Sequence, residues 1–413
     1  MPTNQTSRTV ASTAALRADF PALERRCAGH PVAYFDGPGG TQVPRAVPDA
    51  MVDYLVHHNA NRHWGFPSSA ETDEAVEHAR GVFATFLNAA PEEIVFGANM
   101  TALTFHVSRA FGKELRAGDE IIVTELDHHA NIGPWVLLES ERGIRVQWAR
   151  MILDSGQLDT AQLMRLIHER TKLVAIGAAS NAIGTVNDLR PVVNRAHEVG
   201  ALVYVDGVHH APHLLPDVVD LGCDFYACSP YKFYGPHAGV LYGKRALLEE
   251  LDFPRLAPAG QHAPERAETG TLSHEAIVGA AAAIEWLASL TDGGCLRSRL
   301  RRVYAALHER SARLFERLWS GLLATPGVVL FGPPPGASRT PTAAFVVDGH
   351  ASSEVVRQLA ARGVFASSGD FYAQTVVDRL GLQPEGLTRA GCACYTSEDE
   401  IDRLVAGVRM LDE

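Results

Sequence analysis

The feature that most constrains the fold is an alternation, from about residue 92 onward, of short apolar runs with amphipathic segments. The apolar runs lie at 93–96, 120–124, 173–176, 202–205, 225–227 and 240–242, and helical patterns such as 160–170 and 189–199 lie between several of them. Parallel strands need long crossover connections, usually helices, and bury both of their faces. The alternation therefore predicts an α/β domain with a mostly parallel sheet covered on both sides.

A second domain is predicted where this rhythm changes, near Gly293 and Gly294. One long amphipathic helix is expected at 296–323, followed by a segment rich in proline and glycine, a strand at 342–347 and a closing helix. A chain of 413 residues is long enough for two domains. We expect a large domain at 31–293, a small α+β domain at 294–413, and an N-terminal segment at 1–30 that packs with the small domain.

Charge and cysteine usage narrow the function classes. The formal net charge of −11 argues against nucleic acid and anionic membranes as partners. The sequence contains no apolar run of about 18 residues, and its polar start lacks a signal peptide's apolar stretch. Six sparse cysteines without a repeated CxxC spacing favour a reducing compartment. We therefore expect a cytoplasmic protein with a small-molecule substrate.

Two charged residues follow predicted strands. Asp206 ends the run at 202–205, and Lys232 follows the run at 225–227 among apolar and aromatic neighbours. Ligands of open α/β sheets bind at the carboxyl ends of strands. Burial would lower the pKa of Lys232 and suit it to Schiff-base chemistry, although a lysine here could also extend to solvent.

These residues predict pyridoxal 5'-phosphate as a cofactor. That cofactor needs a lysine, an acid facing its ring nitrogen, donors for its phosphate and a plane against its ring. Asn99, Met100 and Thr101 follow the strand at 93–96 and open a helix, which makes a ready phosphate site. His128 follows the strand at 120–124 and offers an imidazole for stacking.

A set of motifs in a fixed order carries a family resemblance. The motifs lie at 17–21, 33–36, 128–131 with 134–135, 180–181, 205–207, 232–236, 388–390 and 402–405. Together they resemble class V aminotransferase-type pyridoxal phosphate enzymes, in particular the cysteine desulfurase and selenocysteine lyase branch, over nearly the whole chain. The resemblance implies the PLP-dependent transferase fold type I, with a mostly parallel seven-stranded sheet in the large domain and a smaller α+β C-terminal domain. It also implies a homodimer.

Position by position, the resemblance implies roles toward the cofactor. Lys232 would hold it and move the substrate's Cα proton, and Asp206 would pair with the pyridinium nitrogen. His128 would stack on the ring, and Thr101 and Ser229 would bind the phosphate. Without the resemblance, Thr101 and Ser229 would be ordinary helix or turn caps, and His128 would be an ordinary core histidine.

The resemblance also implies contacts to the substrate and to a second subunit. Asn181 and Arg389 would hold the carboxylate of an amino-acid substrate, which suits a bidentate guanidinium. Thr271 would reach the phosphate bound by the neighbouring subunit. A surface salt bridge for Arg389 and a plain turn position for Thr271 are the alternatives.

Three departures from the family pattern are informative. His209 stands where the family usually has glutamine beside the cofactor's phenolic oxygen, and Tyr231 stands where it has histidine before the lysine. The decisive departure is Tyr372, in the loop that carries the sulfur-accepting cysteine of desulfurases. Tyr372 could contact the substrate, pass a proton or only pack the loop. Cys392 and Cys394 are expected as buried thiols.

The expected activity follows from the missing cysteine. Sulfur cannot leave as a protein persulfide through that loop, but β-elimination needs no nucleophile. We expect a C–S lyase acting on cysteine or an S-substituted cysteine, similar to enzymes that process thiol conjugates in natural-product pathways such as the lincosamides. Transamination, epimerisation and decarboxylation with oxidative deamination are the alternatives, and a non-catalytic binding protein of the same fold is a third.

No metal site is expected, although the chain has 18 histidines. His209 and His213 have the spacing of a helical pair, and His57, His58 and His63 form another group. Neither group has the acidic residue of an HExxH motif.

Overall fold

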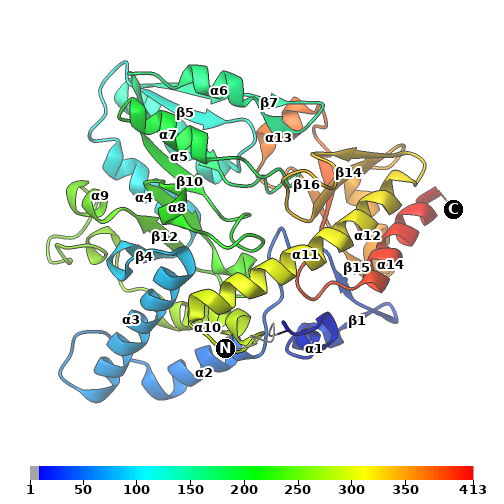
Figure 1. Cartoon of the computed structure of the whole chain (residues 1–413), viewed down its shortest axis with the longest axis horizontal. Coiled ribbons are helices and arrows are strands. Elements are labelled where there is room, and N and C mark those ends of the chain that lie inside the picture. The colour runs from blue at the N-terminus through cyan, green and yellow to red at the C-terminus, as the bar shows by residue number, and fades with distance from the viewer. Residues whose placement is uncertain (1–8, 413) are drawn as a thin grey trace, which may run out of the picture.

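A large lobe of the chain is built on a seven-stranded sheet, as seen in a computed structural model that describes residues 9–412 (Figure 1). The strand order is β4, β12, β11, β10, β9, β5, β6. Only β12 runs antiparallel to its neighbours. This confirms the predicted fold type I with its mostly parallel sheet. The strands are β4 (Ile94–Gly97), β5 (Glu120–Thr124), β6 (Arg145–Ala149), β9 (Thr171–Gly177), β10 (Leu202–Asp206), β11 (Phe225–Cys228) and β12 (Gly239–Gly243).

Both faces of this sheet are covered, because successive side chains of a strand point to opposite sides. In β10, Val203 and Val205 lie in one apolar core and Tyr204 lies in another. The first core receives side chains from α3 (Pro67–Leu87), α6 (Thr160–Leu166), α7 (Arg190–Glu198) and α10 (His274–Ser289). The second receives them from α4 (Met100–Phe111), α5 (Gly133–Arg142) and α9 (Arg245–Glu250). The short helices α2 (Ala46–Asp53) and α8 (Val218–Leu221) complete the large lobe.

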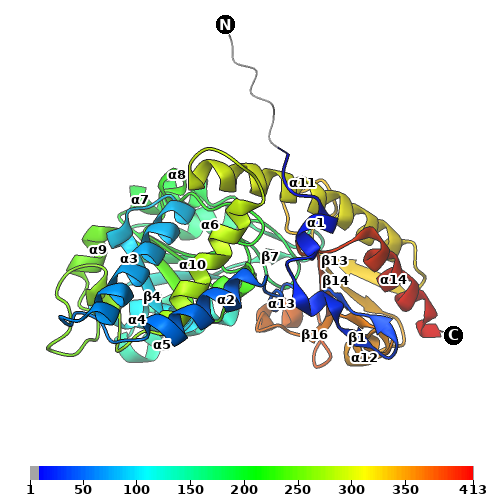
Figure 2. The same cartoon turned by 90° about the horizontal axis from the view of Figure 1, so that it is seen from below.

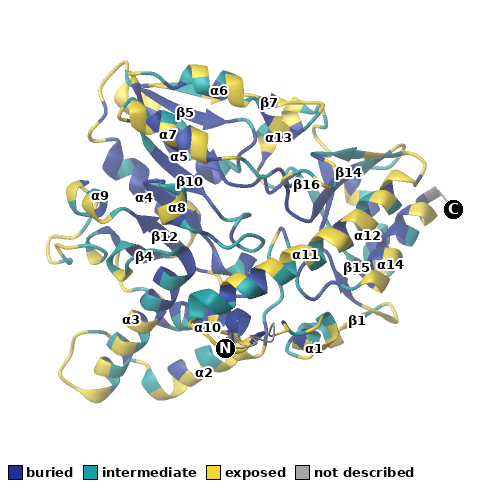
Figure 3. Cartoon of the chain, viewed as in Figure 1, coloured by how far each residue is buried: buried dark blue, intermediate teal, exposed yellow. Residues whose placement is uncertain are grey.

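Burial follows this layering, with the strands of the large sheet buried except for the edge strand β6, and with the outward faces of the helices exposed (Figure 3). None of the helices among residues 9–412 is both long and apolar enough to span a membrane.

The predicted strands all form, with ends displaced by no more than two residues. The apolar runs did not predict β6. This strand lies at the edge of the sheet, and its residues are mostly exposed or half-buried, so they form no apolar run. The helix expected at 160–170 ends at Leu166, and His209 and His213 lie in consecutive turns rather than in a helix.

The small lobe has a four-stranded antiparallel sheet in the order β13, β14, β17, β16. Helix α14 begins after a capping box in which Ser397 and Glu400 satisfy each other's backbone N–H groups. Helices α12 and α14 supply buried side chains to the small-lobe core. The elements are β13 (Val328–Phe331), β14 (Thr342–Val347), β16 (Ser367–Gly369), β17 (Leu387–Gly391), α12 (Ser352–Ala361), α13 (Gln374–Arg379) and α14 (Glu398–Arg409).

One helix, α11 (Leu296–Leu323), belongs to both lobes (Figure 1). Leu300 and Val303 in its first half lie in the large-lobe core, whereas Phe315 and Leu318 in its second half lie in the small-lobe core. At about 1.5 Å per residue, a helix of 28 residues spans the two lobes as one rigid rod.

The N-terminal segment lies beside the small lobe (Figure 2). In α1 (Thr13–Arg17), the Arg17 guanidinium donates to both carboxylate oxygens of Glu400 at 3.0 Å. Strand β3 (Ala33–Tyr34) pairs in parallel with β15 (Val364–Phe365). The short pairs β1 (Arg26–Cys27) with β2 (His30–Pro31) and β7 (Met151–Ile152) with β8 (Gln157–Leu158) are local hairpins. Residues 1–8 of the predicted segment lie outside the described residues, and the domain boundaries remain a prediction.

Candidate functional site

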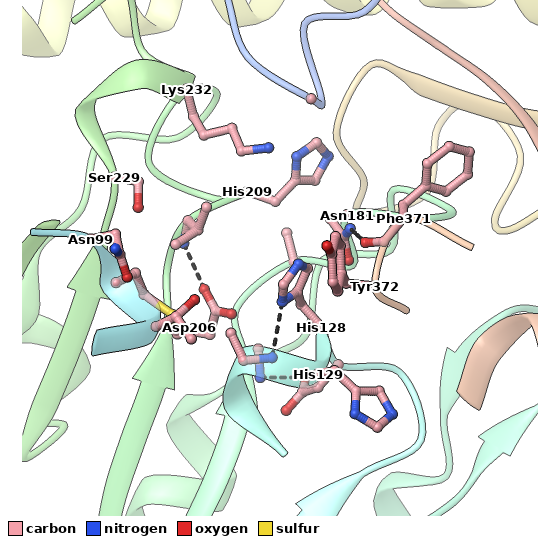
Figure 4. Close-up of a pocket in the computed structure, with 18 of the residues that line it drawn as sticks. Asn99, His128, His129, Asn181, Asp206, His209, Ser229, Lys232, Phe371 and Tyr372 are labelled. Atoms are coloured by element: carbon pink, nitrogen blue, oxygen red, sulfur yellow. Dashed lines mark hydrogen bonds between the residues drawn. The ribbon is translucent and has the colours of Figure 1, made fainter. Parts of the chain in front are cut away.

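A cavity of about 770 Å³ opens at the carboxyl ends of the parallel strands and is lined by residues of both lobes (Figure 4). It brings together every predicted site residue except Thr271. These residues are Met100, Thr101, His128, Asn181, Asp206, His209, Ser229, Tyr231, Lys232, Tyr372 and Arg389.

Lys232 is held at the end of a short helical turn that follows β11. Its side chain extends toward His209 in Figure 4, and its Nζ donates to the carbonyl of Pro38. Nζ also lies 4.9 Å from the centre of the Tyr231 ring. Burial, with a smaller contribution from Arg389, lowers the pKa of Lys232 to about 7. A large fraction of this amine is therefore neutral near neutral pH, as a nucleophilic lysine requires.

Asp206 lies at the end of β10, with a carboxylate oxygen that accepts the backbone N–H of Val208 at 2.9 Å. Burial raises the pKa of Asp206 to about 6, while the charge of Lys232 acts in the opposite direction. A buried carboxylate is stabilised by a cationic partner, so this position favours a ligand with a positively charged group.

A second buried carboxyl, Asp127, lines the cavity and was not predicted. Its two oxygens accept from the backbone N–H of Gly177 at 2.7 Å and from the side-chain amide of Asn131 at 3.0 Å. Burial, and then the charge of Asp206, raise its pKa. Its position just before His128 and three residues after a strand end was the available signal.

His128 presents a neutral ring to the cavity. Its Nδ1 accepts the backbone N–H of Ala130 at 3.0 Å, which assigns the ring proton to Nε2. Burial lowers its pKa to about 4. The Tyr372 ring lies 5.5 Å away, tilted by 32°.

Hydroxyl and backbone donors gather at one end of the cavity. Helix α4 begins at Met100 because the side chain of Asn99 accepts from the backbone N–H of Ala102 at 2.8 Å. Thr101 is exposed in the first turn of this helix, and the buried Ser229 follows β11. The helix N-terminus together with two hydroxyls is suited to an anion such as a phosphate.

At the other end of the cavity lies a buried cation. Arg389, on β17, is 4% exposed, and its Nη1 donates to the backbone carbonyl of Asn181 at 2.8 Å. Burial lowers its pKa to about 9, so the guanidinium remains charged at neutral pH. Within residues 9–412, it forms no ion pair with a carboxylate within 4.0 Å, but the charge of Asp36 acts on it from farther away and favours its charged form. The Phe371 ring covers it, with the guanidinium carbon 3.8 Å from the ring centre.

The loop that covers Arg389 is strained and tied to the large lobe. Phe371 and Tyr372 both have φ of 57°, a left-handed conformation that side chains with Cβ rarely adopt. The carbonyl of Phe371 accepts from the Asn181 side chain at 2.9 Å, and that of Tyr372 accepts from the His129 backbone N–H at 2.7 Å. The side chain of Tyr372 is 73% exposed. Nothing in the sequence pattern indicated the contact between Phe371 and Arg389.

Tyr231 and His209, the two departures from the family pattern near Lys232, are both held by contacts with other side chains. Tyr231 stacks on His237 with ring centres 4.7 Å apart and planes 13° apart. His209 is fully enclosed, with Nε2 near the hydroxyls of Thr340 and Thr342, while its Nδ1 has no protein partner.

Thr271 and the two late cysteines lie elsewhere. Thr271 lines a different cavity of about 760 Å³, together with Arg62 and His63. Cys392 is buried and Cys394 is partly buried, and neither lines the main cavity. Burial raises the pKa of both thiols to about 12, so neither is a thiolate at neutral pH. No group of three or more potential metal ligands occurs in the described part of the chain.

Comparisons with known proteins agree with this architecture. Residues 33–404 match the family model Aminotransferase class-V. A cysteine desulfurase of Dickeya dadantii is 35% identical over 412 residues, which cover 96% of each chain. The crystal structure of a cysteine desulfurase from Escherichia coli matches with a TM-score of 0.84 and 30% identity, covering 97% of this chain and 98% of the other. The apo structure of a cysteine desulfurase from Thermococcus onnurineus matches with a TM-score of 0.88 and 26% identity, covering 98% of each chain.

Proposed function

Because the chain belongs to the aminotransferase class-V family, in its cysteine desulfurase-like branch, we propose that it is a pyridoxal-phosphate-dependent C–S lyase. Its proposed substrate is cysteine or an S-substituted cysteine, from which sulfur leaves by β-elimination. The observation that carries this proposal is the loop at residue 372, which reaches the cavity with a tyrosine instead of a thiol.

The residues around the cavity fit the cofactor. A buried amine, a buried carboxylate and a buried ring nitrogen without a protein partner face one space, in Lys232, Asp206 and His209. Lys232 would hold the cofactor covalently, Asp206 would face its ring nitrogen and His128 would lie against its ring. Ser229 and the start of α4 would bind its phosphate, with Met100 and Thr101 in the first turn. When bound, pyridoxal phosphate withdraws electrons from the substrate's Cα.

The buried guanidinium supports an amino-acid substrate. Arg389 is a desolvated cation that forms no ion pair within 4.0 Å in the described structure, although the charge of Asp36 acts on it from farther away. A substrate carboxylate would compensate its charge directly. The side-chain oxygen of Asn181 is also buried without a partner and could accept from the substrate's amino group. The Asn181 amide nitrogen already donates to the carbonyl of Phe371, so it would have to change partner to reach a carboxylate. An amino acid whose carboxylate meets Arg389 would bring its Cα toward Lys232, which lines the same cavity and whose amine is affected by the charge of Arg389.

The chain's own residues can then carry out elimination. The neutral amine of Lys232 takes the proton from Cα, the Cβ–S bond breaks, and its electron pair leaves with sulfur as a thiolate that is then protonated. Hydrolysis of the remaining three-carbon unit gives pyruvate and ammonia. No protein thiol takes part, in keeping with Tyr372 in the loop and the raised pKa values of Cys392 and Cys394.

The first prediction is that turnover of cysteine or its conjugates leaves no persulfide on the protein and releases pyruvate rather than alanine. A phenol is a much weaker nucleophile than a thiolate at neutral pH, and it cannot store sulfur as a persulfide. Alkylation during turnover followed by intact-mass measurement, with product analysis, checks this.

The variant Tyr372→Phe should change the rate or the substrate preference of the enzyme but still retain the cofactor. A sulfur-loaded Cys392 or Cys394 that turnover requires, or alanine as the product, would refute β-elimination. A transamination, epimerisation or oxidative-deamination product would point to the alternative reactions.

We also propose a homodimer that completes the site. Apolar side chains are exposed on and near α2 and the start of α3, namely Val52 (57%), Leu55 (47%), Val56 (66%), Trp64 (64%) and Phe66 (47%). They adjoin the cavity that contains Arg62, His63 and Thr271. A second copy on this face would cover the apolar patch and bring Thr271 toward the other subunit's phosphate site.

The second prediction is that Trp64→Asp separates the subunits and weakens cofactor retention, as measured by sedimentation velocity and cofactor content. Val219→Asp, on α8, is the matched control, because Val219 is also apolar and is 67% exposed away from this patch. A monomeric wild-type protein with full activity would contradict the proposal.

A further inference from the structure

We propose that Thr340 and Thr342 fix the ring proton of His209 on Nδ1, so that the small lobe determines which hydrogen-bonding group His209 presents to the cofactor. The inference rests on the proposed cofactor for its function, but the position of the proton follows from the chain alone. Thr340 and Thr342 would act as positioning residues.

The three side chains form a closed hydrogen-bonding cluster. His209 Nε2 lies 3.0 Å from Oγ1 of Thr340 and 3.1 Å from Oγ1 of Thr342, and the two hydroxyls are 3.2 Å apart. All three residues are buried, with His209 at 2% exposure and both threonines at 0%. Within residues 9–412, the one other hydrogen bond from these hydroxyls is from Thr340 to the carbonyl of Gly184, at 3.4 Å.

Counting hydrogens assigns the tautomer. If Nε2 lacks a proton, Thr342 donates to Nε2 and Thr340 donates to Thr342, so both hydroxyl protons are used at 3.2 Å or less. If Nε2 carries the proton, the cluster has three hydrogens, and one of them must use the long contact to Gly184. That carbonyl already accepts the backbone N–H of Thr340 at 2.8 Å. The first arrangement is favoured, and it places the proton on Nδ1.

The threonines cannot easily move away, because the backbone around them is tied to the large lobe. Thr340 N–H donates to the carbonyl of Gly184, and Arg339 forms a strand bridge with Thr185. The Arg339 guanidinium donates to the carbonyl of Ile183 at 3.3 Å. The cluster therefore couples the docking of the small lobe to the state of one ring.

Burial, together with the groups around it, keeps the ring of His209 neutral. Burial lowers the pKa of His209 well below its usual value, and His213, Lys232, Arg389 and His210 add to this effect in that order. The ring of His213 is its nearest aromatic neighbour, 5.4 Å away. A neutral ring with its proton on Nδ1 offers one donor to the cavity, which suits the anionic phenolic oxygen of the cofactor.

The test measures the tautomer and the cofactor's spectrum in the loaded protein. With ¹⁵N-labelled histidine, long-range N–H correlation spectra should show His209 protonated at Nδ1 and unprotonated at Nε2, its signals being identified by their loss in His209→Gln. In the double variant Thr340→Val with Thr342→Val, the tautomer should become mixed when the cofactor has been removed, because no anionic oxygen then holds the proton on Nδ1. The pH midpoint of the visible absorption should rise by about half a unit to one unit, the equivalent of one neutral hydrogen bond.

Thr388→Val is the matched control, because Thr388 is a buried threonine of the same sheet whose hydroxyl has no partner. It should move neither the tautomer nor the midpoint. Protonation of His209 at Nε2, or a double variant that keeps both wild-type readings, would overturn the inference. If the double variant does not fold, the tautomer of His209 in the wild-type protein tests the inference by itself. A protein that binds no pyridoxal phosphate would contradict the proposed function, whereas the His209 signals would still report the proton's position.

Discussion

Replacing Lys232 with alanine is expected to lower kcat by at least about a thousandfold while the protein still folds, because the variant loses its proton-transfer group and its covalent link to the cofactor. Borohydride reduction of the wild-type protein followed by peptide mapping should place the cofactor on Lys232. The variant's melting temperature in the cofactor-free state checks the fold. A cofactor adduct on another lysine would contradict the assignment of Lys232 as the attachment site.

Uptake of the cofactor should also depend on pH in a defined way. Because burial lowers the pKa of Lys232 to about 7, the rate of cofactor capture should rise with pH and level off above that value. An ordinary lysine would be neutral in only about one molecule in a few thousand at pH 7. Asp206→Asn provides the comparison, since it should still take up the cofactor on Lys232 but lose turnover, because an amide supplies no negative charge to the ring nitrogen.

Arg389→Ala is expected to raise KM for the amino-acid substrate by about ten- to a hundredfold, which corresponds to a charge-assisted contact of about 1.5–3 kcal/mol. The effect should fall on KM more than on kcat, since the carboxylate is bound in both ground state and transition state. Steady-state kinetics over a range of substrate concentrations measures this.

Arg389→Lys is the matched variant, because lysine keeps the charge but loses the planar pair of donors that fits a carboxylate. It should fall between wild type and Arg389→Ala. Phe371→Leu tests the neighbouring aromatic ring. The centre of that ring lies 3.8 Å from the guanidinium carbon of Arg389. An unchanged KM in Arg389→Ala for every substrate amino acid would remove Arg389 from the site.

Much of the fold could be predicted because its signals are local. Apolar runs fixed six strands of the large sheet, and the placement of Asp206 and Lys232 after two of them indicated the cofactor site. The apolar runs did not predict the edge strand β6, because an edge strand needs no continuous apolar stretch. His209 and His213 were separated by four residues, but the chain turns there instead of forming a helix.

The rest of the site depends on contacts between distant segments, which no local pattern encodes. Phe371 covers Arg389 because the two lie on neighbouring parts of the small lobe. His209 meets Thr340 and Thr342 across more than a hundred and thirty positions of sequence. Asp127 was within reach of sequence reasoning, because it precedes His128, but its bond to Gly177 appears only once β5 and β9 are side by side.

The loop at 369–373 is attached to the large lobe by carbonyl groups of the main chain, at Phe371 and Tyr372. Every amino acid has such a carbonyl, so these attachments do not depend on which side chains occupy the two positions. The side chain of Tyr372 is largely exposed and fills no core space. A substitution at position 372 would therefore leave both attachments to the large lobe in place, so a scaffold of this kind could change which group lines the cavity through a single codon.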